Sequence, residues 1–186
     1  IVFSAVILVG FSWLYFILAL AVKCSDGDKV IYRHARVGKN GKDIYIAKFR
    51  SMKRDADKLD ETLTDEQRKQ YEKEFKIDDD PRITKIGKFL RTTSLDELPQ
   101  IWDIFIGKLS FVGPRPLMRD ELESKYGAAA EKFTSVKPGL MGWWTAHGRS
   151  NCTYESGKRQ RLELYYVDRE SAKNGNGETK RFPFLL

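Results

Sequence analysis

The chain has 186 residues, with 33 lysines and arginines against 26 acidic residues and a formal net charge of +7. This length suits one domain of ordinary size. With 14 glycines, 6 prolines, 2 cysteines and one long apolar run, the composition excludes collagen-like, low-complexity, disulfide-stapled and polytopic membrane proteins. Because the chain opens inside that apolar run and not at a methionine, we expect the natural N-terminus to lie upstream.

The apolar run covers residues 1–22, where 19 of 22 side chains are apolar and only Ser4, Gly10 and Ser12 interrupt. As a continuous helix it would extend ~33 Å, enough to cross a bilayer core. A signal peptide is disfavoured because the run is too long and no small-residue cleavage site follows it. A buried soluble helix is disfavoured because the run is apolar on all sides. We therefore predict a membrane-inserted helix, either spanning or re-entrant with a turn near Gly10 and Ser12.

Basic residues dominate the stretch after the apolar run, namely Lys23, Lys29, Arg33, Arg36, Lys39 and Lys42. The excess of positive charge beside a membrane segment places the remaining chain in the cytoplasm. The cysteines, Cys24 and Cys152, lie far apart and outside any CxxC motif, which disfavours a zinc or redox site and fits a reducing compartment.

Two strands are predicted around residues 30–32 and 44–46, joined by residues 38–41, whose Asn-Gly pair favours a tight hairpin turn. Met52, Ala56, Leu59 and Leu63 have helical spacing, which predicts a helix over this charged stretch.

Thr64 followed by Gln67 resembles a capping box, which predicts that a second helix begins there and runs to Phe75. Ile83, Ile86 and Leu90 then form the apolar side of a short basic helix. That side fits either the protein core or a layer of lipid headgroups.

A further helix is predicted to begin at Ser94, with Leu95, Leu98, Trp102 and Phe105 along one stripe, and to end at Gly107. One interpretation is structural, with Ser94 and Glu97 forming a capping box and Asp96 complementing the helix dipole. The other is functional, because a helix N-terminus suits a phosphate and an ionised carboxylate there can attack phosphorus or hold Mg²⁺.

Three later segments carry weaker signals. Arg115 is fixed between two prolines in Gly113-Pro114-Arg115-Pro116, which suits a guanidinium that binds an anion, although a plain rigid loop fits as well. The pair Trp143-Trp144 is either core or interfacial, and Arg149 adds a cation in a predicted loop.

In this order the segments resemble the bacterial sugar transferase family, the monotopic polyprenyl-phosphate phosphoglycosyl transferases, over about residues 12–167. The motifs that carry the resemblance are Arg36-Val37-Gly38, Lys48-Phe49-Arg50-Ser51-Met52, the long run from Asp80 through Asp96 and Glu97 to Leu117, Lys137-Pro138-Gly139, Gly142-Trp143, Gly148-Arg149 and Tyr165-Tyr166-Val167. The ordered series is specific, unlike any one motif in it.

The resemblance implies transfer of a hexose 1-phosphate from a UDP-sugar to undecaprenyl phosphate with Mg²⁺, through a covalent aspartyl intermediate and with release of UMP. Carried over, Asp96 is the nucleophile, and Glu97 helps to bind Mg²⁺ or manages a proton, so that both carboxylates are expected metal ligands. The residues expected to hold phosphate or nucleotide are Arg91, Arg115, Arg149 and Lys48.

We thus expect an α+β protein at the bacterial inner membrane. Residues 1–22 form the membrane-inserted helix, residues 23–167 a mostly helical cytosolic catalytic domain with a small β-hairpin, and residues 168–186 a divergent tail. The expected partners are a UDP-sugar, undecaprenyl phosphate and membrane lipids, with a homo-oligomer left open and no nucleic acid.

The sequence departs from the family at three places: Ser12-Trp13 replaces a helix-breaking Ser-Pro, residues 143–149 read Trp-Trp-Thr-Ala-His-Gly-Arg, and the tail lacks the usual apolar helix. These departures leave open an alternative, an inactive membrane-bound scaffold for glycan-assembly enzymes. A nucleic-acid binder, suggested by net charge alone, lacks any recognisable module.

Overall fold

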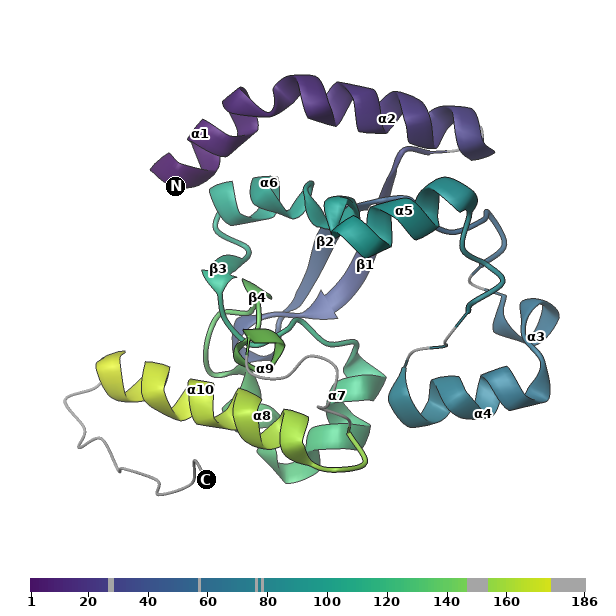
Figure 1. Ribbon diagram of the computed structural model, residues 1–186. Helices are drawn as coiled ribbons and strands as arrows, with labels where there is room; N and C mark the ends of the chain where they lie inside the picture. The colour runs from purple at the N-terminus through teal and green to yellow at the C-terminus, as the bar shows by residue number, and fades with distance from the viewer. Residues whose placement is uncertain (27–28, 57, 76, 78, 147–153, 175–186) are drawn as a thin grey trace. The chain divides into compact units, whose positions relative to one another are not determined.

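The computed structural model describes residues 1–26, 29–56, 58–75, 77, 79–146 and 154–174 (Figure 1). Its contacts divide the chain into two compact units. Unit 1 comprises residues 1–36 and 43–109, and unit 2 comprises residues 37–42 and 110–186. Helices and strands occur in both, in agreement with the predicted α+β class. Arg149 and the tail beyond residue 174 lie outside the described residues.

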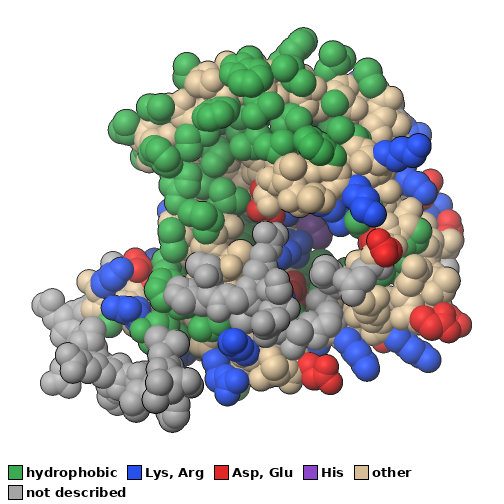
Figure 2. Space-filling model, in the orientation of Figure 1, with side chains coloured by type: hydrophobic (Ala, Val, Ile, Leu, Met, Phe, Trp, Pro, Cys, Tyr) green, Lys and Arg blue, Asp and Glu red, His purple; other side chains and the backbone are tan. Residues whose placement is uncertain are grey.

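The apolar segment forms two helices, α1 (Val2–Gly10) and α2 (Ser12–Asp26), which meet at a bend of 61°. Within the described part of the chain, neither helix alone has the length and apolar character needed to cross a bilayer, whereas the bent pair together has both. The break falls at the interruption by Gly10 and Ser12, as predicted. Large apolar side chains on both helices face outward, and Figure 2 shows them gathered at the top of the view; the most exposed are Ile1, Val2, Val9 and Phe16.

The predicted hairpin is confirmed as β1 (Ile31–Val37) and β2 (Asp43–Phe49), which form a two-stranded antiparallel sheet. A short 3₁₀ turn, η1 (Lys39–Gly41), joins them. Asn40 and Gly41 both have left-handed backbones, with φ of 57° and 72°. These are the residue types that tolerate this conformation, which explains why the Asn-Gly pair marks the turn.

The helix predicted from Met52 to Leu63 is wrong over most of its length, because α3 covers only Leu59–Thr62. Met52 instead forms an isolated antiparallel bridge with Ile83. Tertiary pairing thus outweighs the helical spacing of these apolar residues. The capping box of Thr64 and Gln67 is confirmed at the start of α4 (Asp65–Glu74).

Helix α5 (Lys85–Thr93) places its apolar side in the core of unit 1. Leu90 is fully buried and clusters with Leu18 and Val22 of α2 and Phe49 of β2. The core interpretation of this basic helix is therefore the correct one, with Thr84 as its N-cap. The same packing ties the apolar N-terminal segment to the rest of unit 1.

The capping box predicted for Ser94 and Glu97 is wrong. Ser94 ends α5 in a left-handed conformation, with φ of 58°, and its side chain caps nothing in the described structure. Residues Leu95–Glu97 form a 3₁₀ turn, η2, and the next α-helix, α6, runs only from Gln100 to Phe105. A tight turn between two helices, not a helix N-terminus, therefore carries Asp96 and Glu97.

Unit 2 is built around a parallel pair of short strands, β3 (Ser110–Val112) and β4 (Gly139–Met141). Gly113 and Gly139 let the two backbones touch, since a Cβ on Gly139 would lie 2.2 Å from the Gly113 nitrogen. Around the strands lie α7 (Arg119–Tyr126), η3 (Gly127–Ala129), α8 (Ala130–Thr134), α9 (Trp143–Ala146) and α10 (Lys158–Asn174). Trp144 is buried, so that of the two positions considered for it, core and interface, the core position is the correct one.

Candidate active site

Lys48, Asp96 and Glu97 form a polar cluster in unit 1. Lys48 near the end of β2 donates a hydrogen bond of 2.7 Å from Nζ to Oε1 of Glu97. The same Nζ lies 4.0 Å from Oδ2 of Asp96. One ammonium thus bridges two adjacent carboxylates, which lowers their mutual repulsion and holds both on one side of η2.

Asp96 is the more buried of the two acids. Its side chain is 10% exposed, against 34% for Glu97. Burial raises the pKa of Asp96, Lys48 and Arg91 act against this rise, and Glu97 adds to it. The two adjacent carboxylates therefore have different environments, the pattern expected where two acids have separate roles.

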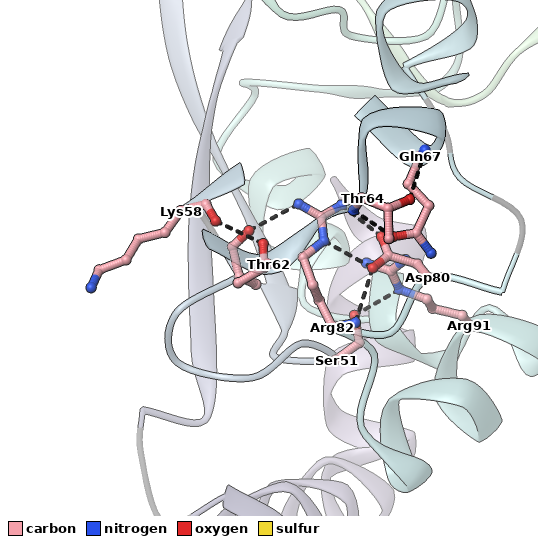
Figure 3. Close-up of polar contacts among 9 residues, drawn as sticks. Ser51, Lys58, Thr62, Thr64, Gln67, Asp80, Arg82 and Arg91 are labelled. Atoms are coloured by element: carbon pink, nitrogen blue, oxygen red, sulfur yellow. Dashed lines mark hydrogen bonds and ion pairs between the residues drawn. The ribbon is translucent and has the colours of Figure 1, made fainter. Parts of the chain in front are cut away.

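Arg91 lies at the last turn of α5 and interacts electrostatically with Asp96. Its Nε donates a hydrogen bond of 2.8 Å to the hydroxyl of Ser51 (Figure 3). Ser51 is buried and follows β2, the strand that carries Lys48. The end of β2 therefore supplies one cation of the site, Lys48, and Ser51 just after β2 holds the other, Arg91.

Near Arg91 lies a buried ion pair between Asp80 and Arg82 (Figure 3). Nε and Nη2 of Arg82 donate to the two oxygens of Asp80 at 2.8 and 2.6 Å, a bidentate geometry. Nη1 of Arg82 donates to the carbonyl of Ala56 at 2.9 Å. The pair fixes the loop before α5 against the segment after β2.

Two further hydrogen bonds join residues that neighbour the cluster to other elements of unit 1. Tyr15 of α2 donates its hydroxyl to the carbonyl of Leu98 at 2.5 Å, directly after η2. Asp103 of α6 accepts from the backbone N–H of Ala47 at 2.8 Å, beside Lys48. The apolar segment, the hairpin and α6 are thus each bonded to residues next to the cluster.

Four of the predicted site residues lie in unit 1: Lys48, Arg91, Asp96 and Glu97. Lys48 is in direct contact with Asp96 and with Glu97. Arg115 belongs to unit 2, where its side chain is exposed and its backbone N–H donates to Oε1 of Glu163 at 3.4 Å. Arg149 lies outside the described residues.

A magnesium ion fits the donor set at η2. Mg²⁺ in enzymes of phosphate chemistry is held by one or two carboxylates together with substrate phosphates and water. Asp96 and Glu97 offer two such carboxylates side by side, with Oε1 of Glu97 bonded to Lys48. No group of three or more potential ligand side chains occurs among the described residues, so a site made of protein ligands alone is not found there.

Three of these residues, Ser51, Asp80 and Arg82, have no role among those predicted from the sequence. Ser51 lies inside a recognised motif, but only the fold brings it to Arg91, 40 positions later. Asp80 and Arg82 carried a readable signal, since an acid and a base two residues apart around a proline can pair across a turn.

Comparison with known proteins identifies the family. The model of the bacterial sugar transferase family matches residues 1–174. An uncharacterised sugar transferase of Haemophilus influenzae is 45% identical over 94% of this chain and 35% of its own length. An undecaprenyl-phosphate galactose phosphotransferase of Salmonella typhimurium is 43% identical over 76% of this chain and 30% of its own length.

A shorter relative is matched over most of its length. The exopolysaccharide production protein ExoY of Sinorhizobium fredii is 39% identical over 86% of this chain and 71% of its own length. By contrast, the chain spans about a third of the length of the Haemophilus and Salmonella proteins. Since the family model covers nearly all of the sequence, the chain belongs to the bacterial sugar transferase family, of the polyprenyl-phosphate phosphoglycosyl transferase type.

Proposed function

We propose that this protein transfers a hexose 1-phosphate from a UDP-sugar to undecaprenyl phosphate, through a covalent intermediate on Asp96. The observation that carries the proposal is the cluster of Lys48, Asp96 and Glu97 at η2. Support comes from relatives whose names describe undecaprenyl-phosphate sugar phosphotransferases.

In the first step a carboxylate oxygen of Asp96 attacks the β-phosphorus of the UDP-sugar. A bond forms between that oxygen and phosphorus, the bond from phosphorus to the bridging oxygen breaks, and UMP leaves with the electron pair. Lys48 supports this step because it favours the ionised form of a carboxylate whose burial favours the protonated form.

In the second step a phosphate oxygen of undecaprenyl phosphate attacks the same phosphorus. The bond to Asp96 breaks, the carboxylate is restored, and the product is an undecaprenyl diphosphate that carries the sugar. Because the substrates enter in turn, one carboxylate and one set of cations serve both.

The negative charge of both substrates must be neutralised near Asp96. We assign this role to Lys48 and Arg91 in unit 1. For Arg115 and Arg149 we keep the role that the family resemblance implies, contact with phosphate or nucleotide. Asp96 and Glu97 would hold Mg²⁺, which when bound stabilises charge on phosphate oxygens.

We further propose that the bent pair of α1 and α2 enters the cytoplasmic membrane as a re-entrant segment, with the catalytic residues on the cytosolic face. The outward apolar side chains of both helices and the basic residues that follow support this placement. Relatives that act on a lipid carrier need the same access to the membrane.

The test is an assay of UMP release from a panel of UDP-sugars, with undecaprenyl phosphate, Mg²⁺ and the full chain in detergent. We expect one or more sugars to support release and the labelled sugar to enter the lipid extract. Asp96→Asn should abolish both, and Asp120→Asn, an exposed aspartate of α7 in unit 2, should abolish neither. Absence of lipid-linked sugar with every donor would contradict the proposal and favour a scaffold.

A further inference from the structure

We infer that Ser51 is a positioning residue, which orients the guanidinium of Arg91 so that its two terminal nitrogens bind a phosphate of the substrate. The inference rests on the proposed function and extends it to a residue that touches neither substrate nor Asp96. Its starting point is the hydrogen bond from Nε of Arg91 to Oγ of Ser51, at 2.8 Å (Figure 3).

The backbone of Ser51 is held rigidly. Its carbonyl accepts the N–H of Thr84 at 3.0 Å, and the N–H of Lys53 donates to the carbonyl of Arg82 at 2.9 Å. These two bonds flank the bridge between Met52 and Ile83. Ser51 is therefore locked against the segment that leads into α5.

Helix α5 packs directly on this backbone. A Cβ on Gly87 would lie 1.9 Å from the carbonyl oxygen of Ser51, so no side chain fits between them. The hydroxyl of Thr84 caps α5 and also lies 3.4 Å from the same carbonyl. Ser51 and the helix that carries Arg91 thus form one fixed body, and Oγ of Ser51 has a defined position relative to Arg91.

The bond to Ser51 uses Nε, the one nitrogen that a bidentate contact through Nη1 and Nη2 leaves free. Among the described residues, the Nη atoms of Arg91 make no hydrogen bond, in contrast to Arg82, whose Nε and Nη atoms are all bonded to protein. A planar guanidinium held at Nε keeps its outer edge available for an oxyanion.

The charges around Arg91 also favour this arrangement. Asp80 is already paired with Arg82, and Asp96 interacts with Arg91 without a hydrogen bond between them. Arg91 therefore has no protein carboxylate as a bonded partner in the described structure. Because the Ser51 hydroxyl is neutral, it can orient Arg91 without neutralising the positive charge of the guanidinium, which stays available for the phosphate.

The experiment is a double-mutant cycle on Ser51 and Arg91 in the full chain, with UDP affinity measured by calorimetry and UMP release by a coupled assay. We expect Ser51→Ala to weaken UDP binding and to lower kcat/KM, each about tenfold. Ser51→Thr, which keeps the hydroxyl, should restore most of both. In the Arg91→Ala background, Ser51→Ala should have no further effect.

Thr92→Ala is the matched control, since it removes an exposed hydroxyl from the same helix, one that bonds only the Lys88 carbonyl of its own turn. It should leave affinity and rate unchanged. Thermal unfolding of each variant separates positioning from stability: a merely structural Ser51 would lower the melting temperature and would act additively with Arg91→Ala.

Additive effects, or an unchanged UDP affinity in Ser51→Ala beside an active parent, would overturn the inference and leave the proposed function intact. A parent that neither binds UDP nor releases UMP would overturn the proposed function, and the inference with it.

Discussion

The ammonium of Lys48 lies 2.7 Å from Oε1 of Glu97, so that a strand residue and a turn residue 49 positions apart form one ion pair. The pair also brings the same ammonium to 4.0 Å from Asp96. Lys48 therefore sets the charge balance of the proposed nucleophile, and its removal has a definite consequence.

Lys48→Met should lower UMP release roughly 100- to 1,000-fold at neutral pH, the scale of losing one electrostatic donor beside a reacting centre. Burial already raises the pKa of Asp96, and Lys48 counteracts the rise. Without Lys48 the pKa rises further, so the acidic limb of the pH–rate profile should move to higher pH. Lys88→Met, which removes an exposed lysine 3.8 Å from Asp79, should leave the profile unchanged. An unshifted acidic limb in Lys48→Met would contradict this role.

Asp80→Ala should destabilise the fold by about 3–5 kcal/mol, because it leaves Arg82 buried without its partner. Urea unfolding measures the change. The control is Lys58→Ala, which removes an exposed ion pair with Glu61 and should cost less than about 1 kcal/mol. Equal midpoints for the two variants would show that the buried pair does not hold this loop.

Glu163 predicts a pH dependence of stability. Burial raises its pKa to about 7 from an ordinary value of 4.5, against the opposing effects of the Arg115 N–H and the charge of Arg159. A carboxyl with a raised folded pKa stabilises most below its unfolded pKa, and this contribution is lost as pH rises through 7. We expect the melting temperature of the parent, relative to Glu163→Gln, to fall between pH 5 and 8. The amide of the variant can still accept the hydrogen bond from the Arg115 N–H. A difference in melting temperature that stays constant between pH 5 and 8 would contradict the raised pKa of Glu163.

The re-entrant segment that we propose, bent by 61° between α1 and α2, predicts that the two ends of the apolar segment lie on one side of the membrane. The exposed Cys24, at the end of α2, gives an internal reference. In a Cys152→Ser background, Ile1→Cys and Cys24 should both react with an impermeant maleimide only after the cells are opened. Reaction of residue 1 alone in intact cells would mean a segment that crosses the bilayer.

The sequence correctly predicted features that depend only on residues close together in the chain, namely a turn, a helix cap and a helix break. The left-handed Asn40 and Gly41 marked the hairpin, and Thr64 with Gln67 marked the start of α4. The break at Gly10 and Ser12 was readable because a glycine interrupts an otherwise uniform run.

Features that depend on distant partners were not readable in the same way. The spacing of Met52 and Leu63 is helical, yet Met52 pairs with Ile83 across 30 residues of chain. The strands at Ser110 and Gly139 have three residues each, too few for a periodic pattern. Ser94 looked like an N-cap because its spacing to Glu97 is that of a capping box, but it adopts a left-handed turn that ends the preceding helix.

In the candidate site, too, some features could be predicted from the local sequence and others depend on distant parts of the chain. Asp96 and Glu97 were found from a motif, whereas the contacts of Lys48 with both, and of Ser51 with Arg91, arise from long-range packing. A motif identifies which residues carry the chemistry, and only the fold shows which of them act together.

The most direct test of the central claim is to incubate the full chain with a UDP-sugar and Mg²⁺ in the absence of undecaprenyl phosphate, quench it with acid, and measure intact mass and peptide masses. The account predicts an increase equal to one hexose phosphate on the peptide that contains Asp96, absent in Asp96→Asn and lost when undecaprenyl phosphate is added. Release of UMP with no phosphosugar on Asp96, or an adduct on another residue, would contradict it.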